Sequence, residues 1–177
     1  LRRGELEKIA ANDINVYFQL AIEMFDYLDE IIALQATIFN FITTFAVSSM
    51  TSAGQCRLIP LIPCIQDSNQ LYDFCVRLMF LLHAKLQEDL LVHHRERFRT
   101  IFHQLNSFYK QSGQLQYFIN LITVPNLPKN PPNFLQQSDL GNYTAPRLKI
   151  IAEDTASESD NNSVVDNLVD TQAQETP

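Results

Sequence analysis

Histidine and cysteine are the residues of this sequence best suited to metal or redox chemistry. The chain has four histidines, at positions 83, 93, 94 and 103, and three cysteines, at positions 56, 64 and 75. A zinc site on a helix needs ligands three or four residues apart, and no two of these histidines have that spacing. Adjacent His93 and His94 point in different directions on a helix and cannot converge on one ion. We therefore expect surface or rim histidines and no metal site.

The cysteines are odd in number and lie 8 and 11 residues apart, which matches neither a disulfide framework nor a CxxC pair. A reducing compartment fits this pattern best. Cys64 and Cys75 fall on the same helical face as neighbouring leucines, so we expect both thiols to pack in the core. The sequence contains no nucleophile elbow, no glycine-rich phosphate loop and no recognisable catalytic carboxylate pair. The pattern therefore predicts no enzyme, no catalytic residue and no cofactor.

The most basic stretch is "HHRERFR", His93 to Arg99. It could contact an anionic lipid head group or an acidic partner. We favour the other interpretation, a solvated helix face on which Glu96 offsets part of the charge. The whole chain of 177 residues has a net charge of -7 and a pI near 5.0, so nucleic acid is not an expected partner.

The elements that would position these residues are helices. Apolar residues recur at helical spacing from Asn12 onward, and Asn12 or Asp13 can cap a helix running to about Asp29. A second helix or a bent extension follows, from Glu30 to about Val47, and then a loop over residues 48 to 55. The run "IIALQATIFNFITTFAV" contains polar residues and is short for a bilayer span, so we interpret it as a buried helix.

Further helices follow towards the carboxyl end. One apolar face continues for about eight turns from Cys56 to Gln87, and we expect Pro63 to bend this helix while Pro60 is tolerated in its first turn. The next helix covers about 92 to 112, with Gly113 as a left-handed cap, and a short one covers 114 to about 124. No strand alternation is visible. The fold class predicted is all-α, with antiparallel helices packed as a bundle or an α-solenoid.

Four prolines lie between Pro125 and Pro132. They predict an extended connector over residues 125 to 132, because the residue before a proline disfavours helix. We expect a short capping helix over about 133 to 140, in which Phe134, Leu135 and Leu140 dock on the other helices. Phe134→Ala should then cost about 2 to 4 kcal/mol.

The last part of the chain differs in composition. Residues 145 to 177 carry two basic and seven acidic side chains, so this segment holds -5 of the net charge. Lacking aromatic residues, it should be a disordered acidic tail. The amino terminus shows no secretory signal, and the chain starts at Leu1 without a methionine, so we expect a fragment of a longer protein.

Four blocks together resemble a known family: "NDINVYFQLAIEMFDYLD", "TSAGQCRLIPLI", "LYDFCVRLMFLLHAKL" and "LQYFINLITVPNLPKNPPNFL". In this order they are similar to the ANTH domains of the huntingtin-interacting endocytic adaptors. The resemblance implies that residues 1 to 144 form the carboxy-terminal part of an ANTH-type α-solenoid. It also implies a cytoplasmic adaptor, peripheral at clathrin-coated pits and vesicles of the plasma membrane, whose family binds phosphatidylinositol 4,5-bisphosphate, clathrin and actin.

The resemblance gives this chain no lipid-binding residue. The family's phosphoinositide site is a lysine-rich cluster on helices that would lie upstream of Leu1, and the coiled coil and actin-binding module are not matched either. We therefore expect weak or no binding to phosphoinositide liposomes. The alternative is a helical protein-interaction or self-association module, because part of Ile31 to Val47 would be exposed without the upstream helices.

Overall fold

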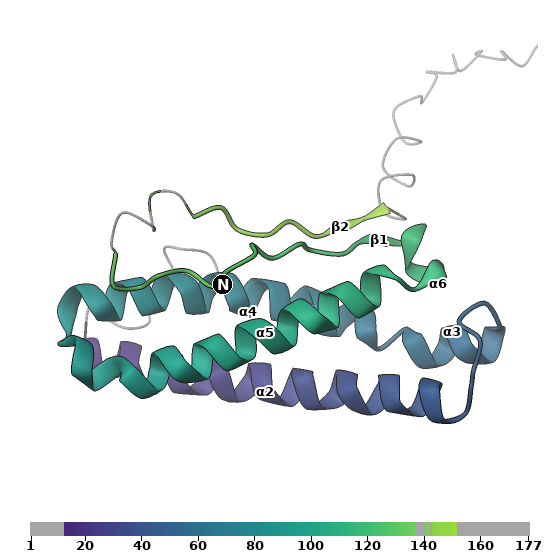
Figure 1. Cartoon of the computed structure of the whole chain (residues 1–177), viewed down its shortest axis with the longest axis horizontal. Coiled ribbons are helices and arrows are strands. Elements are labelled where there is room, and N and C mark those ends of the chain that lie inside the picture. The colour runs from purple at the N-terminus through teal and green to yellow at the C-terminus, as the bar shows by residue number, and fades with distance from the viewer. Residues whose placement is uncertain (1–12, 137–140, 142, 152–177) are drawn as a thin grey trace, which may run out of the picture.

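The computed structural model describes residues 13–136, 141 and 143–151. Three long helices lie side by side, and the chain reverses direction from each to the next (Figure 1). They are α2 (Ile14–Thr44), α4 (Leu61–Lys85) and α5 (Val92–Gly113). Shorter elements connect or follow them: α3 (Ser52–Leu58), the 3-10 helix η1 (Glu88–Leu91), α6 (Gln116–Ile119), β1 (Ile122–Thr123) and β2 (Lys149–Ile150). The predicted all-α fold class is confirmed, with one small strand pair added.

Helix α2 is one continuous helix from Ile14 to Thr44. It replaces the predicted helix to about Asp29 and the second helix or bent extension that was expected after it. Asp13 caps it as predicted, because its Oδ1 accepts the N–H of Asn15 at 2.9 Å. At the other end Ala46 adopts a left-handed conformation with φ of 47°, and the Val47 N–H donates to the Ile42 carbonyl at 3.0 Å. This is the Schellman arrangement, here without a glycine.

The long kinked helix predicted from Cys56 onward is two helices. Helix α3 begins at Ser52, inside the predicted loop, and Thr51 caps it by accepting the Gly54 N–H. Gly54 lies so close to the preceding loop that a Cβ would approach the Ser48 carbonyl oxygen to 2.0 Å. Pro60 separates α3 from α4. Pro63 is then in the first turn of α4, where an N–H has no helical acceptor, so it causes no bend.

The segment after α5 departs from prediction in three ways. Gly113 ends α5 without a positive φ, so the left-handed cap was wrong. Helix α6 stops at Ile119 and gives way to β1, which pairs antiparallel with β2 through Ile122 opposite Ile150. Residues 145–151, predicted as the start of the disordered tail, therefore contribute a strand. Local alternation could not reveal two-residue strands whose partners lie 26 and 28 positions apart.

The proline connector runs without helix or strand from residue 124 to residue 130, as predicted. Asn133 to Gln136 form a hydrogen-bonded turn in place of the first turn of the capping helix, with the Gln136 N–H donating to the Asn133 carbonyl at 3.1 Å. Phe134 is buried as predicted, whereas Leu135 is 50% exposed and does not dock. Residues 137–140, which include Leu140, lie outside the described residues.

The core lies between the three long helices and under the connector. Its largest fully buried side chains are mostly aromatic and come mainly from α2, α4 and α5: Phe25, Tyr72, Phe80, Phe98, Phe102 and Phe108. Cys64 and Cys75 are buried in this core as predicted, and burial raises the pKa of both thiols. Within the described part of the chain, no helix has both the length and the apolar composition to cross a membrane.

Candidate functional site

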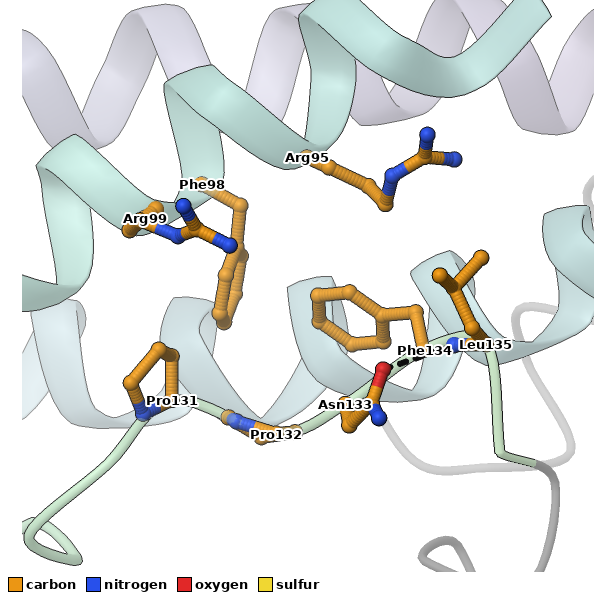
Figure 2. A pocket seen from close by; sticks show the side chains of 8 residues that line it. All are labelled: Arg95, Phe98, Arg99, Pro131, Pro132, Asn133, Phe134 and Leu135. Atoms are coloured by element: carbon orange, nitrogen blue, oxygen red, sulfur yellow. Dashed lines mark hydrogen bonds between the residues drawn. The ribbon is translucent and has the colours of Figure 1, made fainter. Parts of the chain in front are cut away.

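A small pocket lies between the first half of α5 and the segment Pro131–Leu135, which we call the connector turn. Figure 2 shows Arg95, Phe98 and Arg99 on the α5 side of the pocket, with the Phe98 ring pointing to the connector turn and the Arg95 guanidinium turned away from it. Its volume is about 150 Å³. The pocket therefore combines two guanidinium groups with an apolar lining of phenylalanine, proline and leucine.

The floor of the pocket is held by Phe134. Its ring packs edge-on against Phe98, with centroids 4.9 Å apart, and against Phe80 at 5.0 Å. The imidazole of His83 stacks on it from α4 at 5.6 Å. A buried ring held on three sides by two helices is immobile, so it fixes the position of the connector turn. The Leu135 N–H donates to the Asn133 side-chain oxygen at 3.2 Å, which closes the turn.

Arg95 is held on one side of the pocket by two polar contacts. Its Nη1 donates to the Glu88 carbonyl at 2.7 Å and lies 3.2 Å from His83 Nε2. The neighbouring guanidinium and the burial of the ring lower the pKa of His83, burial being the larger cause. A guanidinium has five N–H donors, so Arg95 keeps donors available after these contacts.

Arg99 is one helical turn further along α5 and is exposed. Among the described residues, neither Arg99 nor Arg95 forms an ion pair with a carboxylate. Like charges four residues apart on a helix destabilise it by about 0.2 to 0.5 kcal/mol. The pair therefore forms a local positive site without a carboxylate ion-pair partner.

The third arginine of the basic stretch has a structural role. Arg97 points to α2, where its guanidinium bridges Asp26, at 2.6 Å, and Asp29. The same group lies over the Phe25 ring, 5.6 Å from its centroid. Arg97 therefore does not lie on a solvated face but ties α5 to α2, and its charge is neutralised.

The four histidines do not come together. His93 and His103 are exposed, whereas His83 and His94 are half-buried. His94 lies in the seam between α2 and α5, its ring centroid 4.4 Å from that of Phe18, and its Nε2 has no hydrogen-bond partner among the described residues. Burial, followed by the nearby Arg97, lowers its pKa. Within the described residues, no group of three or more His, Cys, Asp or Glu could hold a metal ion.

Sequence reasoning identified the basic stretch but missed the pocket. The four-residue spacing of Arg95 and Arg99 places both on one helix face, and that signal was available. Their position opposite the connector turn depends on packing between segments more than 30 residues apart. No local pattern encodes that contact.

Comparison with known proteins gives a family match. The ANTH domain family model matches residues 1–144. Huntingtin-interacting protein 1 from Homo sapiens is 43% identical over 169 residues, which are 96% of this chain and 16% of that protein. Huntington interacting protein related 1 from Caenorhabditis elegans is 40% identical over 82% of this chain and 16% of its own length. Endocytosis protein end4 from Schizosaccharomyces pombe is 27% identical over 69% of this chain and 11% of its own length.

Proposed function

The chain belongs to the ANTH domain family, and from that premise we propose that it is part of a non-enzymatic adaptor of endocytosis. The family match over residues 1–144 carries this proposal. It is supported by the name of the fission-yeast relative, an endocytosis protein. The chain spans about one sixth of the length of the two animal relatives, so the proposal concerns the role of one domain within a larger protein.

At finer resolution, we propose that the complete protein is a peripheral membrane protein of clathrin-coated pits and vesicles at the plasma membrane. It would couple phosphatidylinositol 4,5-bisphosphate, clathrin and actin through different segments. Residues 1–144 would supply the carboxy-terminal part of the ANTH domain. The described part of the chain contains no lysine-rich cluster, so we assign no lipid-binding residue to this chain.

Liposome sedimentation tests the lipid assignment. The full chain is mixed at physiological salt with phosphatidylcholine vesicles, with and without phosphatidylinositol 4,5-bisphosphate. We expect little pelleting that depends on the head group, because each exposed lysine or arginine near an anionic surface contributes only about 1 kcal/mol. Strong head-group-dependent pelleting would contradict the proposal that this chain lacks the site.

Imaging tests the adaptor assignment separately. The gene that encodes this segment is tagged at its own locus, and the protein is imaged together with clathrin at the plasma membrane. We expect recruitment to coated structures. A protein that remains diffuse, or that marks another organelle, would contradict an endocytic role whatever the liposomes show.

A second candidate function is self-association, and the outer face of α2 favours it. Leu34, Phe41 and Phe45 are exposed there, and no charged residue occurs from Ile31 to Cys56. An exposed apolar surface of this kind marks an interaction site in many proteins. Concentration-dependent sedimentation would support this candidate.

A further inference from the structure

We propose that the pocket between α5 and the connector turn binds an acidic peptide, and that its occupant is the chain's own segment, residues 152–177. The argument rests on the charge of the pocket, on its apolar lining and on the composition of the segment. It goes beyond the proposed adaptor function, which does not involve this pocket.

The pocket offers positive charge that the described residues leave without a carboxylate ion-pair partner. Arg99 forms no hydrogen bond or ion pair within the described part of the chain, and Arg95 uses Nη1 for the contacts to Glu88 and His83. Their side chains originate one helical turn apart, about 6 Å along the axis. Carboxylates that enter between them would receive charge-assisted hydrogen bonds and relieve the repulsion of the two arginines.

The lining selects a peptide over a small inorganic anion. Half-buried Pro131 and Pro132 and half-exposed Leu135 form an apolar wall beside the guanidinium groups, over the buried rings of Phe98 and Phe134. A phosphate or sulfate ion would leave this wall in contact with water. A segment that carries both carboxylates and aliphatic side chains would satisfy both parts of the pocket.

Residues 152–177 have this composition. They contain seven Asp and Glu and no Lys or Arg, so this segment alone accounts for the whole net charge of -7. Aliphatic side chains occur between its acids, at Val164, Val165, Leu168 and Val169. The rest of the chain has equal numbers of acidic and basic residues. Arg95 and Arg99 are the arginines of α5 that form no ion pair with a carboxylate among the described residues.

The covalent link favours this segment over a separate partner. Helix α5 has 22 residues and is about 33 Å long, whereas 26 residues can extend to roughly 85 Å from Ile151. Every part of α5 is therefore within reach. Attachment to the same chain gives the segment an effective concentration on the order of millimolar, which lets weak contacts form.

An anionic membrane fits the same residues less well. Glu88, Asp89 and Glu96 are exposed next to the two arginines along the chain. A flat anionic surface would meet these carboxylates together with the arginines, whereas a narrow peptide can reach the guanidinium groups and avoid them. The acidic peptide is therefore the occupant that the local charges favour.

Photo-crosslinking in the full chain tests the proposal. Leu135 is replaced by p-benzoyl-phenylalanine, the chain is irradiated, and mass spectrometry maps the crosslinked residues. We expect crosslinks to residues 152–177. Arg99→Gln should lower their yield about 1.4- to fivefold, because an exposed ion pair contributes about 0.2 to 1 kcal/mol. Raising the salt to 1 M should lower it similarly.

Lys110→Gln is the matched control, since Lys110 is an exposed cation in the last turn of the same helix. Its yield should equal that of the parent. Crosslinks to other parts of the chain, or a yield that Arg99→Gln does not change, would overturn the proposal.

Two further outcomes would reassign the pocket. Crosslinks that join isotopically light chains to heavy chains in a mixture would show that the segment binds a second copy. Arg99-dependent pelleting with vesicles that contain phosphatidylinositol 4,5-bisphosphate, without crosslinks to the segment, would assign the pocket to a lipid head group. Either result would overturn the intramolecular contact.

Discussion

Two aromatic regions of this molecule differ in what covers them. Between α4 and α5, the rings of Phe80 and Phe98 are covered by Phe134, which is only 4% exposed. At the end of α2, Phe41 and Phe45 contact each other, with centroids 4.5 Å apart, yet Phe45 is 64% exposed. In sequence the second region is the more apolar of the two, because Phe98 stands in the basic stretch His93 to Arg99 and no charged residue occurs from Ile31 to Cys56. The difference is that a returning chain segment buries the first region, whereas the second region is contacted by the Arg57 guanidinium of α3, 5.1 Å from the Phe41 centroid, and stays exposed.

The two halves of α2 show the same difference within one helix. Its buried residues run from Tyr17 to Gln35, and none of the residues from Ala36 to Thr44 is buried. Helix α2 contacts both α4 and α5, and the rings of its first half that meet α5 are Phe18 against His94 and Phe25 against Phe98. The sequence therefore predicts which residues of α2 favour burial, and tertiary contacts decide which of them are buried.

The largest effect should come from the covered region. Phe134→Ala removes a buried ring between two helices and should lower the free energy of unfolding by about 2 to 4 kcal/mol. Chemical denaturation measures this loss. Leu135→Ala is the matched control because the neighbouring side chain is half-exposed, and it should change stability by less than about 0.5 kcal/mol. Equal effects of the two substitutions would show that the turn does not anchor through Phe134.

A smaller effect on stability should come from His94, in the seam between α2 and α5. It should appear as a dependence of stability on pH. The pKa of His94 is lowered in the folded chain, so below the unfolded pKa of about 6.5 the unfolded state binds more protons. The contribution of His94 is therefore fully present above that pH and is lost as the pH falls through the lowered folded value. Melting temperatures measured from pH 7.5 to pH 5 should decrease towards acid.

His94→Phe should reduce this decrease, because the ring then has no ionisable group while it keeps its contact with Phe18. Gln104→Ala, an exposed change on the same helix, is the control and should leave the pH dependence as in the parent. An identical slope in the His94 variant would exclude this histidine as a source of acid sensitivity.

The smallest effect on stability should come from the uncovered region. Phe45→Ser should change the free energy of unfolding by about 0.5 kcal/mol or less, since that ring is mostly in water already. Its effect should appear in sedimentation velocity, where the variant should self-associate less than the parent at high concentration. A monomeric parent at all concentrations would remove the support for self-association.

The sequence by itself determined the helices and the family. Asp13 as a cap and the apolar period of α2, α4 and α5 are local signals, and both appear in the structure. The burial of Cys75 and Phe134 also followed, because each stands among apolar neighbours at the right spacing.

Tertiary structure alone decided the pairing of β1 with β2, the bridge from Arg97 to α2, and the pocket opposite the connector turn. Each joins segments that are far apart in the chain, so no window of sequence contains both partners. The left-handed Ala46 and the close approach of Gly54 to the Ser48 carbonyl belong with these features, because both lie where the chain turns from α2 into α3. Helical periodicity specifies which side of a helix is apolar, but which segment returns to cover that side depends on the path of the whole chain.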